Sequence, residues 1–132
     1  MVKTTLDNKD NNEQLPIIQQ FNSYINSRDI KGLATLMTDG HTFIDSANTT
    51  FKGKENVLKT WNGFFELFPD YKNVFEKFLS HNNTVVIIGR SICSDKRLDG
   101  PALWTVKLED GKVAEWRVYE DNPENRKLLG TG

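Results

Sequence analysis

The turn at Asp110-Gly111 constrains the fold of this 132-residue chain more than any other stretch of its sequence. Glycine tolerates the positive φ that a tight hairpin needs, and the segments on either side, 102–108 and 112–121, are rich in valine, leucine, tryptophan and tyrosine. These segments are therefore predicted to be two strands of one hairpin. The second carries ionisable side chains among aromatic ones, which is typical either of a half-buried pocket wall or of an edge strand with a solvated polar face.

Upstream of this hairpin, the spacing of apolar residues predicts helices. Apolar residues recur at helical spacing in three segments, 15–27, 30–37 and 54–67. Segment 41–45 alternates as an extended strand between the second and third of these helices. The polar segment 46–53 that follows it is predicted to be a loop.

After Pro69 the pattern changes to strands. Segments 71–79 and 84–93 are extended, with a turn at 81–83 between them, and they precede the closing hairpin. Residues 123–129 are expected to form a short helical turn. Three helices with one interposed strand, followed by four antiparallel strands, predict an α+β domain in which helices pack on one side of a curved antiparallel sheet.

Composition limits the classes of partner. A net charge of −1 gives no electrostatic basis for binding nucleic acid or an anionic membrane, and no apolar run reaches the length that spans a bilayer. The single cysteine, Cys93, excludes an intrachain disulfide, and two histidines without a cysteine cluster speak against structural zinc. We expect no cofactor, a flexible lead-in at 1–13 and one domain at 14–132. The polar N-terminus lacks a signal-peptide core, so a cytoplasmic location is expected by default.

Four phrases occur in the order and spacing of a known family: HTFID at 41–45, FKGKENVLKTW at 51–61, FPDYKN at 68–73 and DGKVAEWRVYED at 110–121. With them the chain resembles the nuclear transport factor 2-like superfamily, and within it the SnoaL-like proteins. The resemblance implies a cone in which helices close a bent sheet around a deep apolar pocket, and a homodimer through the outer sheet face. The superfamily includes polyketide cyclases, ketosteroid isomerases, dehydratases and epoxide hydrolases, and also members without catalysis, so the fold alone does not fix the function.

Asp45 ends the first predicted strand, where the resemblance implies that its carboxylate points into the cone. Its position resembles the general base of the ketosteroid isomerases, and apolar surroundings strengthen a carboxylate as a base. The alternative is a loop-entry aspartate that caps the backbone of Asn48 or Thr49. The tyrosine and aspartate that stabilise the oxyanion in those isomerases fall on Phe21 and near Trp104 here, so the resemblance does not extend to steroid chemistry.

Asp121 is the preferred candidate acid/base residue. An aspartate near this place acts in SnoaL-like cyclases, and WRVYED resembles the end of the limonene epoxide hydrolases, where the matching aspartate works with an arginine that corresponds to Arg90. The acid-donating aspartate of that set falls on Ile92, which speaks against epoxide opening. We expect Arg90 and Asp121 to pair beside the cavity, because a buried arginine needs a carboxylate partner. The alternative is that Arg90 reaches solvent and Asp121 caps the segment that begins at Pro123.

The pocket is expected to have an aromatic lining. The candidate substrate-binding residues are Tyr24, Trp61, Phe64, Phe68, Trp104, Trp116 and Tyr119. Aromatic residues on helices belong to the core more often than to a ligand site. Strand alternation places Trp116 and Asp121 on opposite faces, so a bulge near Tyr119 would be needed to turn both inward. His41, on the same side of its strand as Asp45, is a further candidate.

Two functions from different classes fit these residues. The first is a cofactor-free isomerase, cyclase or lyase that acts on a small apolar carbonyl compound, with Asp121 or Asp45 moving the proton and Arg90 holding a carboxylate. The second is a non-catalytic ligand-binding or dimeric assembly module of the same fold. Buried carboxylates lining an open pocket would favour chemistry, and a cone filled by tryptophan would favour a module. We expect a homodimer, because the outer face of the closing hairpin offers apolar residues that a monomer would expose.

Overall fold

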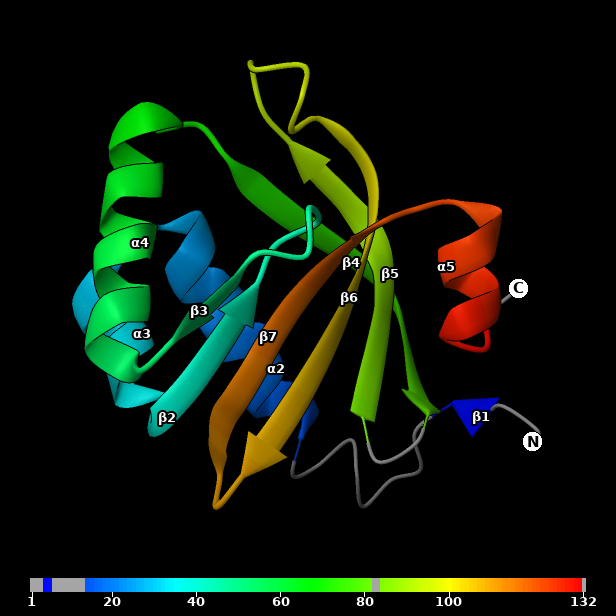
Figure 1. Ribbon diagram of the computed structural model, residues 1–132, viewed down its shortest axis with the longest axis horizontal. Helices are drawn as coiled ribbons and strands as arrows, with labels where there is room; N and C mark the ends of the chain where they lie inside the picture. The colour runs from blue at the N-terminus through cyan, green and yellow to red at the C-terminus, as the bar shows by residue number, and fades with distance from the viewer. Residues whose placement is uncertain (1–3, 6–13, 82–83, 132) are drawn as a thin grey trace.

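The computed structural model describes residues 4–5, 14–81 and 84–131. It shows an α+β fold in which three helices cover one side of a curved sheet (Figure 1). This confirms the predicted fold class. Most of the lead-in predicted for residues 1–13 lies outside the described residues, and Thr4–Thr5 within it form the short strand β1.

The helices follow the apolar spacing of the sequence. Within the described ranges they are α2 (Leu15–Asn26), α3 (Ile30–Thr35), α4 (Lys54–Leu67) and α5 (Pro123–Leu128). Pro16 lies in the first turn of α2, where its missing N–H has no intrahelical partner to lose. The Asp29 side chain caps α3 by accepting a hydrogen bond from the backbone N–H of Gly32 at 2.9 Å. Asn122 caps α5 in the same way, through the N–H of Asn125 at 2.8 Å.

The described strands form one seven-stranded sheet. In chain order they are β1, β2 (Met37–Ile44), β3 (Thr50–Lys52), β4 (Lys72–His81), β5 (Thr84–Ile92), β6 (Gly100–Glu109) and β7 (Lys112–Glu120). Their order across the sheet is β1-β4-β5-β6-β7-β2-β3, and all neighbours are antiparallel except β2 and β7, which are parallel. The predicted hairpin turn is present, with φ of 52° at Asp110 and 76° at Gly111.

Two predictions around β2 are wrong. The second helix ends at Thr35, and Met37, which the apolar spacing places in that helix, pairs instead with Val113 of β7. The N–H of Val113 donates to the carbonyl of Leu36 at 2.6 Å, which draws this segment into the sheet. The predicted loop 46–53 contains β3, whose residues pair with the end of β2. In both places pairing across the sheet outweighs local propensity.

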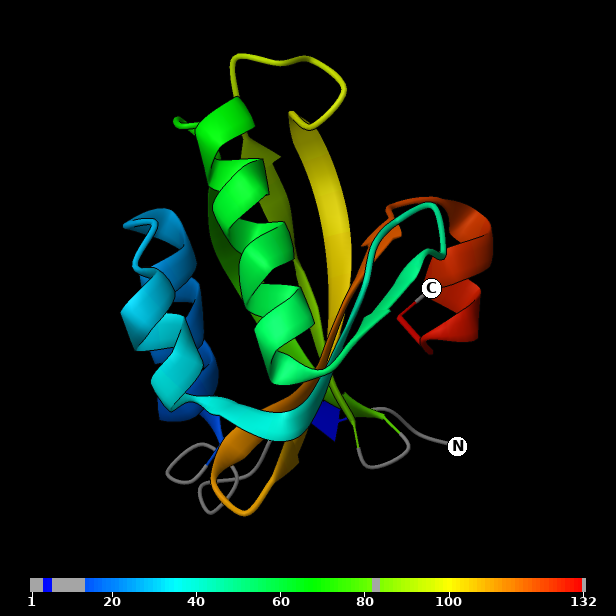
Figure 2. The same cartoon turned by 60° about the vertical axis from the view of Figure 1, so that its left-hand side comes forward.

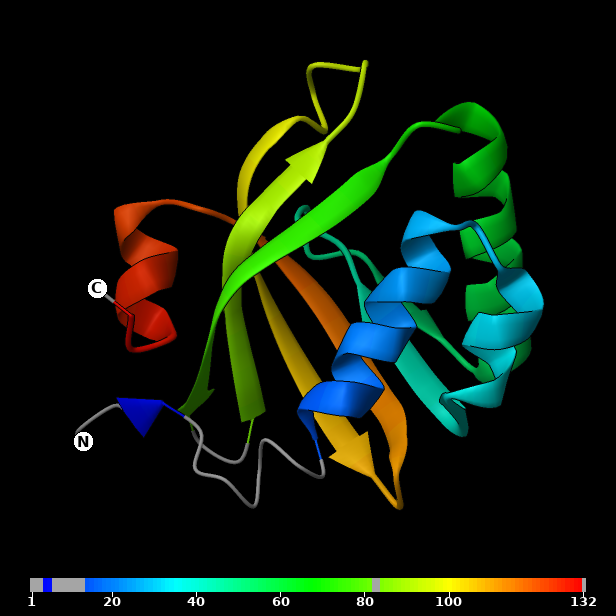
Figure 3. The same ribbon diagram turned by 180° about the vertical axis from the view of Figure 1, so that it is seen from behind.

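The sheet has an inner face covered by α2, α3 and α4, and an outer face on which α5 lies (Figures 2 and 3). Trp104 and Trp116 are fully buried on the inner face. The ring of Phe75 lies 4.9 Å from Trp104, and that of Phe21, from α2, lies 4.6 Å from Trp116, between centroids. These rings form the centre of the core between α2 and the sheet.

The C-terminal segment covers an apolar patch on the outer face. Leu129, directly after α5, is 5% exposed and packs with Leu79, Val86 and Leu103 of β4, β5 and β6. Tyr119 of β7 packs against the same group. The chain therefore buries part of its own outer face, which leaves less apolar surface for a partner.

Candidate functional site

A small apolar cavity lies between α4 and the inner face of the sheet, at the end of β2. Its volume is about 110 Å³. Its walls come from the end of β2, α4, the residue before β4, the β5–β6 loop and β7: Phe43, Asp45, Ser46, Thr60, Trp61, Phe64, Tyr71, Leu98 and Val118. Asp45 supplies the charge in an otherwise mainly apolar wall. An apolar cavity with a few converging polar groups is typical of a small-molecule site.

Asp45 lines the cavity and also caps the loop that follows β2. Alternation along β2 puts Phe43 and Asp45 on the same side of the strand. Its Oδ1 accepts hydrogen bonds from the backbone N–H groups of Ala47 at 3.0 Å and Thr49 at 2.9 Å, so it does cap the loop. In the part of the chain that the structure describes, no donor reaches the other oxygen, Oδ2. One oxygen thus fixes the carboxylate, and the other is available to a ligand.

Trp61 and Phe64, two candidates from the sequence, lie in the cavity wall. The Trp61 ring is 5.2 Å from Phe43 and 5.7 Å from Phe64, between centroids, and the residue is 4% exposed. Within the described ranges its indole N–H has no hydrogen-bond partner. A buried donor without a partner has lost its hydrogen bond to water without forming another, which costs free energy. A ligand oxygen could supply that bond.

Tyr71 adds a hydroxyl group that sequence reasoning missed. The residue is 6% exposed, and its hydroxyl lies 3.1 Å from Ser91 Oγ, which donates to Asn73 Oδ1 at 2.9 Å. Burial raises the pKa of Tyr71, so the phenol stays protonated at neutral pH. The available signal was the spacing of Tyr71 and Asn73, since polar residues two apart at the start of a strand share a face.

His41 lies deeper than the cavity wall and has a structural role. It is fully buried, and its Nδ1 is 2.7 Å from the carbonyl oxygen of Val113, so Nδ1 carries the proton and donates. Burial lowers the pKa of His41 despite this bond, which keeps the ring neutral. Its Nε2 has no partner among the described residues. The side chain spans the place where the β2–β7 pairing is irregular, between Met37 and Thr42.

Asp121 and Arg90 do not form the pair that we expected. Both carboxylate oxygens of Asp121 accept hydrogen bonds from Arg126 of α5, at 2.6 and 2.9 Å. The Arg126 guanidinium holds the pKa of Asp121 below its ordinary value. Arg90 is exposed and lies opposite Pro101 in the β5–β6 pair. Asp121 therefore anchors the C-terminal helix, and neither residue lines the cavity.

The register of β7 explains this outcome. Its pairing with β6 is irregular only at the turn end of the described hairpin, next to Leu108, so no bulge near Tyr119 turns Asp121 inward. Trp116 faces the core, as the isomerase comparison implied. Tyr119 faces outward, where the Arg117 guanidinium lies 4.6 Å from its ring centroid. Tyr119 is thus not a wall of the cavity.

The remaining aromatic candidates also lie outside the cavity wall. Trp104 belongs to the fully buried core. Phe68 packs on Phe64 with centroids 5.0 Å apart. The Tyr24 ring lies so close to Gly32 of α3 that any Cβ there would collide with it. These three residues support the fold around the site.

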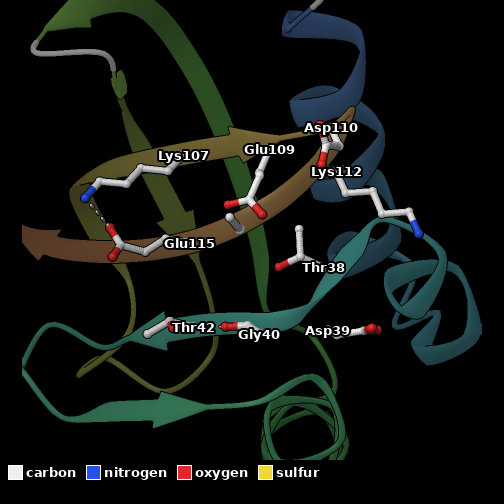
Figure 4. A pocket seen from close by; sticks show the side chains of 10 residues that line it. Thr38, Asp39, Gly40, Thr42, Lys107, Glu109, Asp110, Lys112 and Glu115 are labelled. Carbon is white, nitrogen blue, oxygen red and sulfur yellow. Dashed lines mark hydrogen bonds and ion pairs between the residues drawn. The ribbon is translucent and has the colours of Figure 1, made fainter.

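A larger hollow, of about 740 Å³, lies on the outer face between β2 and the closing hairpin (Figure 4). Polar and charged residues provide most of its lining: Thr38, Asp39, Thr42, Lys107, Glu109, Asp110, Lys112 and Glu115. Lys107 and Glu115 form an ion pair at 3.8 Å. This surface lacks the apolar area of a small-molecule site. This charged lining differs from the apolar outer face that was expected on the hairpin. The homodimer itself stays a prediction.

No three histidine, cysteine, aspartate or glutamate side chains among the described residues gather closely enough to hold a metal ion. No helix that the structure describes is long and apolar enough to cross a membrane.

Sequence comparison places the chain in a family. The model of the SnoaL-like domain matches residues 18–116. The chain belongs to the SnoaL-like domain family. The matched region of this SnoaL-like protein includes every residue of the cavity wall except Val118. No curated protein matches it significantly.

Solved structures show the same fold as this SnoaL-like protein. A proposed SnoaL-like polyketide cyclase from Jannaschia sp. CCS1 is 19% identical, with a TM-score of 0.71 over 92% of this chain and 94% of that one. A proposed polyketide cyclase from Sinorhizobium meliloti is 11% identical, with a TM-score of 0.70 over 78% and 93%. A proposed ketosteroid isomerase from Kribbella flavida is 14% identical, with a TM-score of 0.67 over 91% and 89%. At these identities the likeness concerns the fold alone.

Proposed function

We propose that this protein binds a small, largely apolar carbonyl compound in the 110 Å³ cavity and moves a proton on it without a cofactor. Asp45 is the acid/base residue of this proposal. The observation that carries it is the state of the Asp45 carboxylate, which lines an apolar cavity with Oδ1 fixed by two backbone N–H groups and Oδ2 unpartnered within the described chain. A positioned carboxylate beside an apolar binding surface suits removal of a proton from carbon next to a carbonyl group.

The volume of the cavity limits how much of a ligand it can enclose. A cavity of roughly 150 Å³ holds a benzene ring. The cavity here, at about 110 Å³, is smaller, and compounds of about four or five carbon atoms fit such a space. Steroids and polyketides, the classes that appear in the names of similar structures, are larger than this. We therefore propose a short ketone or aldehyde.

A non-catalytic ligand-binding module is the second candidate function. The full burial of Trp104 and Trp116 favours it, because tryptophan side chains fill the core of the cone and leave a small space for a ligand. In such a module Asp45 would accept a hydrogen bond from the ligand without removing a proton from carbon. The two candidates therefore differ in turnover and agree on the binding site.

Hydrogen–deuterium exchange at carbon separates these functions. Cyclopentanone and 2-butanone are incubated with the protein in D2O, and the loss of the signals from hydrogens next to the carbonyl is followed by NMR. The enzyme reading predicts exchange faster than in buffer, reduced about 100-fold or more in Asp45→Asn. This variant keeps an oxygen that can accept the loop hydrogen bonds while losing the base. Asp39→Asn, at an exposed aspartate of the outer hollow, is the matched control and should exchange like the parent.

The outcomes distinguish the two candidates. Exchange that depends on Asp45 supports the enzyme. Saturable binding without accelerated exchange supports the module. Neither binding nor exchange with these ketones would reject the proposed ligand class.

A further inference from the structure

We propose that Tyr71 binds the oxygen atom of the ligand, and that Ser91 and Asn73 behind it let the Tyr71 hydroxyl switch between offering a lone pair and offering a proton. This inference rests on the proposed function of the cavity. It adds a hydrogen bond between the Tyr71 hydroxyl and the oxygen atom of the ligand. It begins from the burial of all three side chains and from the two hydrogen bonds that connect them.

Tyr71 and Asp45 reach the cavity from distant parts of the sheet. Tyr71 immediately precedes β4 and Asp45 follows β2, and β5, β6 and β7 lie between these strands in the sheet. Both residues nevertheless line one cavity of about 110 Å³, because the sheet is curved. A ligand that fills this space therefore lies within reach of a hydroxyl group and of a carboxylate that come from different walls.

The protons of the chain can be counted. Ser91 has one hydroxyl proton and donates it to Asn73 Oδ1 at 2.9 Å. The 3.1 Å contact between Tyr71 and Ser91 must then have Tyr71 as the donor. In this arrangement the Tyr71 proton is used inside the chain, and only the lone pairs of its oxygen remain for the ligand. The Asn73 Nδ2 atom is buried and has no partner among the described residues.

Rotation of the Asn73 amide by a half turn reverses the chain. Nδ2 then donates to Ser91, Ser91 donates to Tyr71, and the Tyr71 proton is free to point into the cavity. Each arrangement contains two hydrogen bonds and leaves one amide atom unpartnered, Nδ2 in the first and Oδ1 in the second. Both arrangements therefore keep the same number of hydrogen bonds inside the chain, and we infer that the ligand selects between them.

The backbone of Asn73 is fixed while its amide turns. Its N–H donates to Asn26 Oδ1 at 2.8 Å, and its carbonyl accepts from Asn26 Nδ2 at 3.0 Å and Asn22 Nδ2 at 3.2 Å. Helix α2 thus holds the base of the side chain in place. The switch needs no movement of the strand.

A carbonyl ligand selects the arrangement in which Tyr71 donates. Asp45 Oδ2 takes a proton from the carbon next to the carbonyl group, the electron pair of that C–H bond forms a carbon–carbon double bond, and the carbonyl π pair moves onto oxygen. The Tyr71 O–H donates a hydrogen bond to this oxygen as its negative charge develops. Return of the proton from the Asp45 carboxyl to carbon closes the cycle, with no oxidant or reductant consumed.

The test uses Tyr71→Phe and Ser91→Ala in the full chain, with Tyr119→Phe on the outer face as the matched control. Exchange of cyclopentanone hydrogens in D2O should fall about 100- to 1000-fold in Tyr71→Phe. Ser91→Ala should lower exchange by a clearly smaller factor than Tyr71→Phe, because the Tyr71 hydroxyl still donates to the ligand but has lost the Ser91 hydrogen bond that strengthens it as a donor. Equal exchange in Ser91→Ala and the parent would show that Ser91 takes no part. Tyr119→Phe should leave exchange unchanged. Thermal unfolding establishes that each variant is folded.

A second measurement does not depend on turnover. The carbonyl stretching frequency of bound cyclopentanone is compared between the parent and Tyr71→Phe by infrared spectroscopy. A shift to lower frequency on binding that disappears in Tyr71→Phe supports the contact. The same frequency in both proteins would overturn it, even if exchange falls for another reason.

These outcomes separate the inference from the function on which it rests. Exchange that needs Asp45 but is unchanged in Tyr71→Phe overturns the role of Tyr71 and leaves the proposed function standing. Exchange that is insensitive to Asp45→Asn overturns the proposed function, while the infrared shift still decides the Tyr71 contact. Loss of exchange in Ser91→Ala as large as in Tyr71→Phe would overturn the switch, because it would show that Ser91 is needed to hold Tyr71 in place.

Discussion

The Nδ1 atom of His41 lies 2.7 Å from the carbonyl oxygen of Val113, at the place where the β2–β7 pairing is irregular. The His41 side chain thus donates a hydrogen bond to a backbone oxygen across the irregular stretch between Met37 and Thr42. The ring is fully buried, with its centroid 5.8 Å from that of Phe21. The neutral form of this histidine is therefore part of the folded structure, and a charged ring would be poorly solvated.

Stability should decrease as the pH falls below about 6.5, the ordinary pKa of histidine. Burial lowers the pKa of His41 in the folded chain, so the unfolded chain takes up this proton first. The contribution of His41 is fully present above the unfolded pKa and is lost as pH falls through the lower folded pKa. Chemical denaturation across pH should show this slope, and His41→Gln, whose amide can still donate to Val113, should flatten it.

The histidine effect can be told apart from that of the carboxylates. Arg97 lowers the pKa of Asp95 to about 2, and Arg126 lowers that of Asp121. Stability from such carboxylates is fully present above their unfolded pKa of about 4 and is lost as the pH falls through their lower folded pKa. A slope between about pH 6.5 and 5 that is equal in His41→Gln and in the parent would contradict the role given to His41.

Trp61→Ala should lower the free energy of unfolding by about 3–5 kcal/mol. Trp61 is buried against Phe43, Phe64 and Phe65, so truncation removes these contacts and enlarges the neighbouring cavity. Lys59→Ala, on the exposed side of α4, is the control and should change stability by less than about 0.5 kcal/mol. Denaturant titration measures both. A Trp61→Ala variant as stable as the parent would show that this face of α4 does not pack as the structure has it.

Leu129→Ala should destabilise the chain by about 2–3 kcal/mol, while Leu128→Ala should have almost no effect. These adjacent leucines differ in burial, at 5% and 63% exposed. Leu129 packs with Leu79, Val86 and Leu103 on the outer face, so its loss weakens the attachment of the C-terminal segment. Equal unfolding free energies for the two variants would show that α5 does not cover this patch in solution.

The homodimer is predicted to form through the outer face. Ile92 and Val74, 46% and 42% exposed, lie on that side of β5 and β4 and offer apolar surface to a partner. Ile92→Glu should weaken the dimer about tenfold or more, because association would bury an unpaired charge. Leu67→Glu, at a residue 74% exposed near the end of α4, is the control. Sedimentation at micromolar concentration gives the mass, and a parent protein with the mass of one chain would reject the dimer.

The elements that the sequence predicted correctly depend on local physical chemistry. Three helices follow from apolar residues spaced to form one buried stripe. The closing hairpin follows from Asp110-Gly111, because a short connection needs residues that accept positive φ. Together with the phrase order of the SnoaL-like family, these features predicted the α+β fold from a single chain.

Tertiary structure decided which carboxylate lies at the cavity. In a strand, a shift by one position moves a side chain to the other face, and local composition does not say which face is inside. Trp116 of β7 is buried in the core, so Asp121 lies on the opposite face of its strand, beside Arg126. Asp45 lies at the cavity. Tyr71 and Asp45 lie next to β4 and β2, and three strands separate β4 from β2 in the sheet. The two residues meet at one cavity because the sheet is curved. Curvature is a property of the whole packed sheet, so the sequence alone could not reveal their proximity.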